Sequence, residues 1–270
     1  MEKESWQLQM FRRSLKKRAK MRTLIRMLPD VRGKRCLDIT CGDNTGSLNY
    51  YFRAHGGWWV SADLEGRNLP VMMSLLRERV LHLDERHFCF PDDYFDVVVS
   101  IDCLEHLREE KPFLAELYRV TKPGGTALVT VPNGDSRLLA NKLKNLIGMT
   151  PDKYGHVRPG YTYQELEDVV KAVGFQVVGR AGYSRFFMES LELMINAMYV
   201  LVMNKDKEEA PEGVIAPTSQ EALKSHGVSY RLYGLMYPVL WLISRLDHLL
   251  FWGGHYAVAV RATKPEQHTS

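Results

Sequence analysis

The sequence has few of the features that define disulfide-rich, metal-binding or membrane-spanning proteins. Its 270 residues include only four cysteines and no CxxC spacing, so neither a disulfide framework nor a metal site is expected. The longest apolar runs are shorter than the about 20 residues that a membrane-spanning helix needs. The N-terminus lacks the apolar segment and the cleavage site of a signal peptide. A reducing, cytoplasmic setting is therefore predicted.

Basic residues are concentrated in one segment. The net charge is +4, but residues 1–26 hold nine Lys or Arg and two acids, a balance of +7 that leaves the remainder at −3. Apolar residues interleave with the basic ones and predict an amphipathic helical arm that covers the sheet edge. Its basic side is either a solvated face on a packed helix or a surface that attracts an anionic membrane or a phosphate-bearing substrate. Nucleic acid is disfavoured, because aromatic residues do not alternate with the basic ones.

A complete GxGxxG dinucleotide motif is also absent, although a related loop is present. A predicted strand from Arg35 to Ile39 contains Asp38 and leads into a loop with glycines at Gly42 and Gly46. Glycines let the backbone approach a ligand that a Cβ would push away. Thr40 occupies the position of the first glycine, and the turn before Gly46 is one residue longer than the compact form. By itself the loop indicates only a nucleotide-like ligand.

Further strands follow at regular intervals. Trp58 to Asp63 reads as a second strand whose final acid lies 21 residues after Gly42, where a carboxylate can accept ribose hydroxyls. A continuous apolar run from Val97 to Ile101 is typical of a strand that is buried on both faces. Other predicted strands are Val80 to Leu83, Thr126 to Val131, Phe175 to Arg180 and His255 to Arg261.

The motifs LDITCG, FPDDYFDVV, LEHL and TKPGG occur in this order. The chain therefore resembles a class I S-adenosylmethionine-dependent methyltransferase over residues 33–183, of the group with LDxGCG, LPFPDxSFDxV, LEH and LKPGG signatures. A hydride-transferring Rossmann enzyme is the rival, but it would need an intact GxGxxG and no PGG turn. The resemblance implies a Rossmann-like α/β fold: a seven-stranded, mostly parallel sheet with an antiparallel last strand and helices on both faces.

The resemblance also implies S-adenosylmethionine as cofactor and nominates its binding residues. Asp38 and the Gly42 to Gly46 backbone would face the methionine part, Asp63 the ribose, and Asp84 with the Glu85 amide the adenine. The full set of candidate cofactor-binding residues is Asp38, Thr40, Gly42, Gly46, Asp63, Leu64, Asp84, Glu85 and Asp102. For each acid the alternative is a turn or capping role.

Two histidines are the candidate catalytic residues. A hydroxyl or an acidic carbon must lose a proton before it accepts a methyl group, and histidine is the usual base near neutral pH. His106 follows the fourth strand at the edge where ligands bind, and His156 comes from a loop over that edge. The alternative for either is a structural contact.

The predicted organisation has four parts. A basic helical arm spans residues 1–30, the cofactor-binding core residues 31–183, an apolar helical insertion residues 184–253, and a final strand residues 254–264. Within the core, Thr162 and Glu165 predict a reciprocal capping box at the start of a helix. The insertion holds two helices, about Phe186 to Met203 and about Tyr230 to Phe251, joined by a polar linker at about 204–228. Pro238 should kink or restart the second helix.

The insertion is interpreted either as a lid or homodimer surface, or as an apolar cover for a lipid-like substrate. The function predicted is methyl transfer to oxygen, or secondarily to carbon, of a small hydrophobic, lipid-like or glycosylated acceptor. The protein would be cytoplasmic, with peripheral attachment to the anionic inner membrane surface left open. A catalytically inactive methyltransferase-fold protein that acts in assembly or binding is the alternative, because Thr40 departs from the family pattern.

Overall fold

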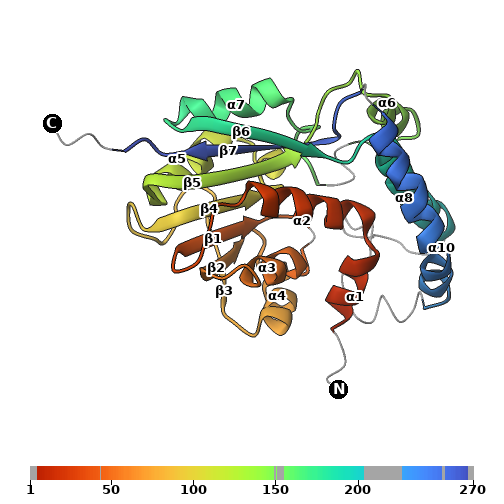
Figure 1. Cartoon of the computed structure of the whole chain (residues 1–270), viewed down its shortest axis with the longest axis horizontal. Coiled ribbons are helices and arrows are strands. Elements are labelled where there is room, and N and C mark those ends of the chain that lie inside the picture. The colour runs from red at the N-terminus through yellow and green to blue at the C-terminus, as the bar shows by residue number, and fades with distance from the viewer. Residues whose placement is uncertain are drawn as a thin grey trace.

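The computed structural model describes residues 5–42, 44–148, 150, 155–203, 227–250 and 253–266. Within them, strands form one sheet in the order β3-β2-β1-β4-β5-β7-β6 (Figure 1). The strands are β1 (Arg35–Thr40), β2 (Trp58–Asp63), β3 (Val80–His82), β4 (Phe95–Ile101), β5 (Thr121–Pro132), β6 (Gln176–Tyr183) and β7 (Ala257–Thr263). Strands β1 to β5 pair in parallel, and β7 runs antiparallel between β5 and β6. The predicted mostly parallel sheet with an antiparallel last strand is confirmed.

The parallel strands end together at one edge of the sheet. Thr40 at the end of β1 pairs with Asp63 at the end of β2 and with Ile101 at the end of β4. Ligands of open α/β sheets bind outside such carboxyl ends. The register therefore brings the glycine loop, Asp63 and the residues after β4 to a common edge.

Helices cover both faces of the sheet. Successive residues of a strand point to opposite faces, and here both sets are apolar and need to be buried. Ile39 and Val98 pack with α5 and α7 on one face, while Val97 and Val99 pack with α2 and α3 on the other. The helices are α1 (Trp6–Arg13), α2 (Leu15–Met27), α3 (Ser47–Arg53), α4 (Leu69–Leu76), α5 (Glu110–Val120), α6 (Leu139–Leu146), α7 (Tyr163–Ala172), α8 (Phe186–Met203) and α10 (Gly227–Arg245). Short 3-10 turns are η1 (Gly66–Asn68), η2 (Leu104–His106) and η4 (Leu246–Leu249).

The basic arm forms two helices instead of one. The Ser14 hydroxyl accepts a hydrogen bond from the Lys17 backbone N–H and caps the start of α2. Serine favours the extended backbone of an N-cap, so the chain breaks and restarts here. Helix α2 lies across a face of the sheet (Figure 1), where Met21 and Leu24 are buried. The arm is thus part of the core and not only a cover for the sheet edge.

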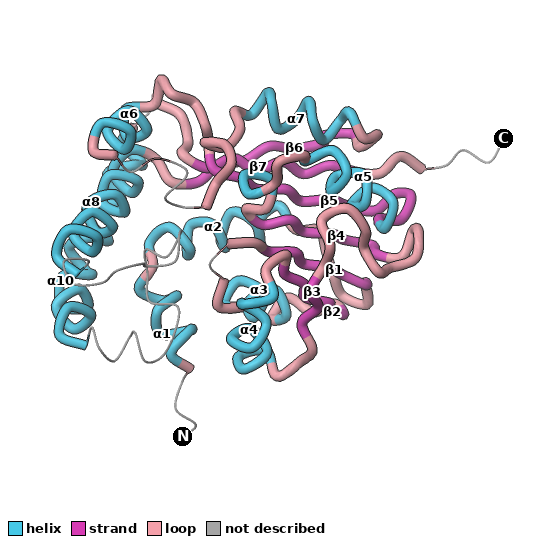
Figure 2. The backbone as a smooth tube through the Cα atoms, turned by 180° about the vertical axis from the view of Figure 1, so that it is seen from behind, coloured by secondary structure: helices cyan, strands magenta, loops and turns pink. Residues whose placement is uncertain are grey.

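The insertion forms the two expected helices. Helix α8 has the predicted bounds, and α6, α8 and α10 lie together beyond the carboxyl ends of the parallel strands (Figure 1 and Figure 2). Helix α10 continues through Pro238, where the sequence predicts a kink or a restart. The predicted linker lies almost wholly outside the described residues. None of the helices in the described part combines the length and apolar character needed to cross a bilayer.

Two helix termini show why some boundaries were predictable and others were not. Thr162 and Glu165 form the reciprocal capping box that the sequence predicts for α7. Helix α10 ends at Arg245, earlier than predicted, and the Asp247 side chain that follows binds the start of α8. Its carboxylate accepts the backbone N–H of Phe187 at 2.7 Å, at the start of α8. The end of one insertion helix therefore caps the other.

Candidate active site

The loop after β1 lies at the carboxyl edge, and its glycines have left-handed backbone geometry. The φ angle is +73° at Gly42 and +80° at Gly46. A Cβ on Gly42 would lie 3.0 Å from Nε2 of His106, so glycine also lets this imidazole approach the loop. Asn44 stabilises the turn by accepting the Gly46 N–H at 3.0 Å. Asp43 lies outside the described residues.

Asp63 ends β2 with a fully buried side chain, and the protein supplies its hydrogen bonds. Thr40 Oγ1 donates to one carboxylate oxygen at 2.6 Å. The Glu65 backbone N–H and Asn68 Nδ2 donate to the other oxygen at 2.7 and 3.0 Å. Burial raises the pKa of Asp63 to about 6, and these donors oppose the shift. The Asn44 side chain also acts on this carboxylate, so the protein's own donors take up most of its about four acceptor positions, and a ligand hydroxyl would have to share or replace one of them.

Asp38 is also buried, and its contacts run to α3. The Asn49 side-chain amide donates to its carboxylate, and Arg53 Nη1 lies 3.7 Å from its second oxygen. Burial raises the pKa of Asp38 to about 6, although Arg53 opposes the shift. Asp38 therefore joins β1 to α3 behind the glycine loop.

The candidate adenine-binding residues Asp84 and Glu85, and the further cofactor-binding candidate Leu64, lie at the far end of the same edge. Asp84 is exposed, and its carboxylate accepts the backbone N–H of Arg86 at 2.7 Å. Glu85 and Leu64 are half-buried. The Leu64 N–H donates to the Thr40 carbonyl at 3.0 Å and so continues the pairing of β1 with β2. These side chains remain accessible to a ligand beside the loop.

Asp102 follows β4 with a φ of +49°, a conformation that costs strain in a non-glycine residue. Lys20 of α2 forms an ion pair with its Oδ2 atom. The Oδ1 atom is buried and has no hydrogen-bond partner in the described part of the chain. The Lys20 ammonium also lies 5.9 Å from the ring centroid of Tyr183. The arm therefore places a cation directly at the carboxyl edge.

The two candidate catalytic histidines come together. Their rings are nearly perpendicular, with centroids 4.7 Å apart. Nδ1 of His106 lies 3.0 Å from the Gly155 carbonyl oxygen, so the neutral ring donates from Nδ1 and keeps a lone pair on Nε2. Burial lowers the pKa of His106, and burial together with His106 lowers the pKa of His156 to about 4. Both rings are neutral near pH 7, which is the form that accepts a proton.

Glu105, between Asp102 and His106 in sequence, is an acid that the sequence did not single out. Its side chain is buried, its Oε2 atom has no partner among the described residues, and burial raises its pKa. Ligand atoms of Glu105, His106 and His156 lie within 4.8 Å of one another, as do those of Cys41, Glu65 and His106. The fold thus brings together side chains that could bind a metal ion, although no metal site was expected from the sequence.

A cavity of about 290 Å³ opens beside His156, between the carboxyl end of β5, α6 and α8. Its polar lining residues include Lys16, Asn133, Asn141, Lys144, His156, Glu189 and Glu192. Glu189 is buried and pairs with Lys144 and, at 3.0 Å, with Lys16. Although burial opposes it, these lysines lower the pKa of Glu189 to about 2. The cluster joins α2, α6 and α8 around the cavity.

Sequence reasoning missed Lys20 and Glu189 as site residues. Glu189 is one of only two acids in the apolar segment Phe186–Met203, and an isolated buried acid requires a partner. That pattern could have indicated it. Lys20 is one of nine basic residues in the arm, and its partner Asp102 is distant in sequence, so no local pattern distinguishes it.

The residues at this edge fit S-adenosylmethionine, which carries a sulfonium and an ammonium group. Asp102 Oδ1 and Glu105 Oε2 are buried carboxylate oxygens that lack donors in the described region, as a cationic ligand would require. Asp63, at the end of β2, is the carboxylate placed to accept a ribose hydroxyl. Thr40 departs from the expected glycine at this position, and its hydroxyl already donates a hydrogen bond to the Asp63 carboxylate.

Comparisons with known proteins identify the family of the chain. A family model described as a methyltransferase domain matches residues 9–179. The chain is 29% identical over 170 residues to the ubiquinone/menaquinone biosynthesis C-methyltransferase UbiE of Vibrio campbellii, covering 53% of this chain and 65% of that protein. It is 27% identical over 159 residues to the ubiquinone biosynthesis O-methyltransferase of Ruegeria pomeroyi, covering 56% and 63%. The matches thus span slightly less than two thirds of each relative.

Solved structures show the same fold. An S-adenosylmethionine-dependent methyltransferase from Mesorhizobium loti superposes with a TM-score of 0.55 at 15% identity, covering 91% of this chain and 97% of that one. Phosphoethanolamine N-methyltransferase 2 of Haemonchus contortus, in complex with S-adenosylmethionine, has a TM-score of 0.54 at 20% identity, covering 92% and 52%. At these identities the likeness concerns the fold alone.

Proposed function

The chain belongs to the methyltransferase domain family, and we propose that it transfers a methyl group from S-adenosylmethionine to an oxygen atom of an amphiphilic, lipid-like or glycosylated acceptor. Its fold is that of the class I S-adenosylmethionine-dependent methyltransferases. The observation that carries the proposal is the juxtaposition of three features at one sheet edge. These are the glycine loop, the pair of neutral histidines and the polar cavity beside them.

Methyl transfer to a hydroxyl group requires two functions of the protein. Bound S-adenosylmethionine supplies an electrophilic methyl carbon, so the protein must orient the acceptor and remove its proton. His106 is suited to remove the acceptor proton. Its Nδ1–H donates to the Gly155 carbonyl, which leaves Nε2 free to accept a proton. His156 lines the cavity and is suited to orient the acceptor hydroxyl.

An amphiphilic acceptor matches two neighbouring surfaces. The cavity beside His156 is lined mainly by polar and charged side chains and suits a hydroxylated or glycosylated group. Apolar residues that recur every three or four positions lie exposed on α10 and η4 and suit an apolar tail. This α10 stripe consists of Leu235, Val239, Leu242, Leu246 and Leu249, which are 38–78% exposed. Two curated relatives are named for ubiquinone biosynthesis, which also supports a lipid-like acceptor.

The α10 stripe also supports attachment to an anionic membrane surface. Exposed apolar residues along one helix are a feature of peripheral membrane helices, and the net charge of +4 favours an anionic surface. Flotation with vesicles of phosphatidylglycerol and phosphatidylcholine should recover the protein, and Leu235→Gln with Leu242→Gln should reduce that recovery several-fold. Equal flotation of wild type and this variant would show that the α10 stripe does not bind the membrane. A change in oligomeric state without a change in flotation would identify a homodimer surface instead.

Cofactor binding is the first test of the enzyme. Titration calorimetry with S-adenosylmethionine should give a saturable signal that Asp63→Ala abolishes and His106→Ala preserves. Transfer of a tritium-labelled methyl group to a lipid extract should fall about a hundredfold or more in His106→Ala. His55→Ala, at an exposed histidine, serves as the matched control. Equal loss of binding in the Asp63 and His106 variants would refute the catalytic role of His106.

A protein that has lost catalysis and acts in assembly or binding is the second candidate. Two observations favour it: Thr40 occupies part of the Asp63 carboxylate, and Lys20 neutralises one oxygen of Asp102. Both contacts must open or be shared when the cofactor binds. A purified chain that shows neither a thermal shift nor a heat of binding with S-adenosylmethionine would support this alternative.

A further inference from the structure

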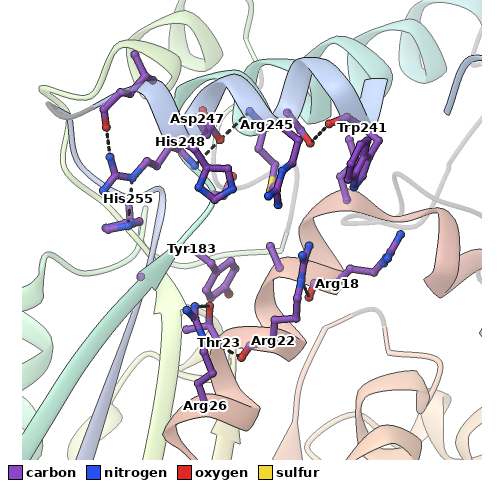
Figure 3. A pocket seen from close by; sticks show the side chains of 18 of the residues that line it. Arg18, Arg22, Thr23, Arg26, Tyr183, Trp241, Arg245, Asp247, His248 and His255 are labelled. Carbon is purple, nitrogen blue, oxygen red and sulfur yellow. Dashed lines mark hydrogen bonds between the residues drawn. The ribbon is translucent and has the colours of Figure 1, made fainter. Parts of the chain in front are cut away.

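A second and larger cavity lies between the basic arm and the insertion. Its volume is about 740 Å³, within the size range of small-molecule sites. Figure 3 shows the arginines of α2 on one side, with Arg245 and His248 on the other. We call it the arginine cavity, after the five arginines that line it: Arg18, Arg22, Arg26, Arg185 and Arg245. It shares no lining residue with the cavity beside His156.

We propose that the arginine cavity binds the phosphate group of a phosphorylated amphiphile. Guanidinium groups match phosphate oxygens with paired hydrogen bonds, and several of them together favour an anion with more than one charge. The proposal goes beyond methyl transfer, because such a ligand would bind without a methyl donor.

The first support is the absence of neutralising partners in the described part of the chain. None of the five arginines forms an ion pair with a described carboxylate, although arginines elsewhere, such as Arg53 and Arg119, do. Arg18 donates to the Tyr237 hydroxyl at 2.6 Å, and Arg22 and Arg26 donate to backbone carbonyls. These partners are neutral, so the charge of the arginines is left for a ligand.

Asp247 is the single described acid in the lining, and it is engaged elsewhere. Its carboxylate accepts three backbone N–H groups at the start of α8, from Arg185, Phe187 and Met188, at 2.7–3.2 Å. A carboxylate that caps a helix in this way has little capacity left for the guanidinium groups of α2 and α10. The cavity therefore keeps a strong positive charge.

The second support is the crowding of like charges. The pKa of the Arg22 guanidinium is lowered, first by burial and then by the neighbouring charges of Arg18 and Arg245. The three side chains come from two helices that are far apart in sequence. A folded protein accepts such repulsion at a cost, and a bound anion would relieve it.

The third support is the apolar part of the lining, which indicates an amphiphile. Leu15, Ile25 and Met188 line the cavity with the rings of Tyr237 and Trp241. The Arg245 guanidinium lies 5.6 Å from the Trp241 ring centroid, so one wall offers charge and apolar surface side by side. An inorganic anion would use only the charged part.

Calorimetric titration without S-adenosylmethionine tests the proposal. The probes are inorganic diphosphate, short-chain phosphatidic acid below its micellar concentration and, as a zwitterionic control, short-chain phosphatidylcholine. Arg22→Gln with Arg245→Gln should raise the Kd for the first two probes at least about tenfold. Arg79→Gln with Arg108→Gln removes the same charge at two exposed arginines and should leave both Kd values unchanged. Arg22→Lys with Arg245→Lys should restore part of the affinity.

The outcomes separate the sources of the phosphate. Tighter binding of phosphatidic acid than of diphosphate supports an amphiphile and assigns the site to a lipid headgroup. The reverse contradicts the amphiphile and leaves a site for a soluble phosphorylated compound. Absence of binding by both probes overturns the proposal, as does equal affinity in wild type and the Arg22/Arg245 glutamine variant. Thermal unfolding of each variant shows that the fold is retained. Because no methyl donor is present, failure here leaves the proposed methyl transfer untouched.

Discussion

Replacing Glu189 with glutamine tests whether the buried charge cluster holds the insertion to the rest of the protein. Glu189→Gln keeps the size of the side chain but removes the charge that Lys16 and Lys144 share. The amide can still accept from the Ser184 hydroxyl, which lies 2.7 Å from the carboxylate. The change therefore isolates the ionic part of the contact among α2, α6 and α8.

The expected loss follows from the pKa of the carboxyl group. The pKa of Glu189 falls from 4.5 to about 2 in the folded protein. At about 1.4 kcal/mol for a tenfold change in the acid constant, this lowering of the pKa corresponds to about 3 kcal/mol of stability at neutral pH. Burial lowers the pKa of Lys144 even beside Glu189, so this lysine can release its proton in the variant and limit the loss. For a protein of this size, about 3 kcal/mol should lower Tm by about 6–12 °C.

Glu192→Gln is the matched control, one helical turn further along α8. Burial raises the pKa of Glu192, so its charged form is disfavoured in the folded protein. Its replacement should leave the free energy of unfolding unchanged or raise it at pH 7. Urea denaturation of the two variants under identical conditions provides the comparison.

The pH dependence gives a further check on Glu189. Its folded pKa is depressed, so its contribution is fully present above pH 4.5 and is lost as the pH falls through about 2. The stability difference between wild type and Glu189→Gln should therefore shrink on acidification. A loss below about 1 kcal/mol at pH 7 would refute the reasoning. An equal loss in Glu192→Gln would do the same.

Three further predictions concern the cofactor loop, the candidate base and α7. Thr40→Gly should tighten S-adenosylmethionine binding about threefold or more by calorimetry, because it frees an oxygen of Asp63; weaker binding would contradict this. If His106 is the base, its lowered pKa should place the midpoint of the acidic limb of kcat below pH 6.5, and His106→Ala should remove that limb. Thr162→Ala should cost about 1 kcal/mol in urea unfolding through loss of the capping box with Glu165, and Thr162→Ser should not.

Most of the sheet and much of the edge where the site lies could be predicted from the amino-acid sequence. Apolar runs such as Val97 to Ile101 predicted buried strands. Asp63 and the glycines Gly42 and Gly46 predicted that a ligand binds at the carboxyl edge of the sheet. The capping box of Thr162 and Glu165 was also predictable, because its partners are three residues apart. These features depend on interactions between near neighbours or on hydrophobic periodicity, and both can be read along the chain.

The charged residues that act together could not be identified before the fold was known. Lys20 meets Asp102, Glu189 meets Lys16 and Lys144, and the arginines of α2 meet Arg245 only because the fold brings distant segments side by side. Asp247 likewise ends α10 early by capping another helix. The energy of such contacts depends on burial and separation in space. The sequence showed that the arm is basic and the insertion apolar, and the fold decided that they enclose a cavity.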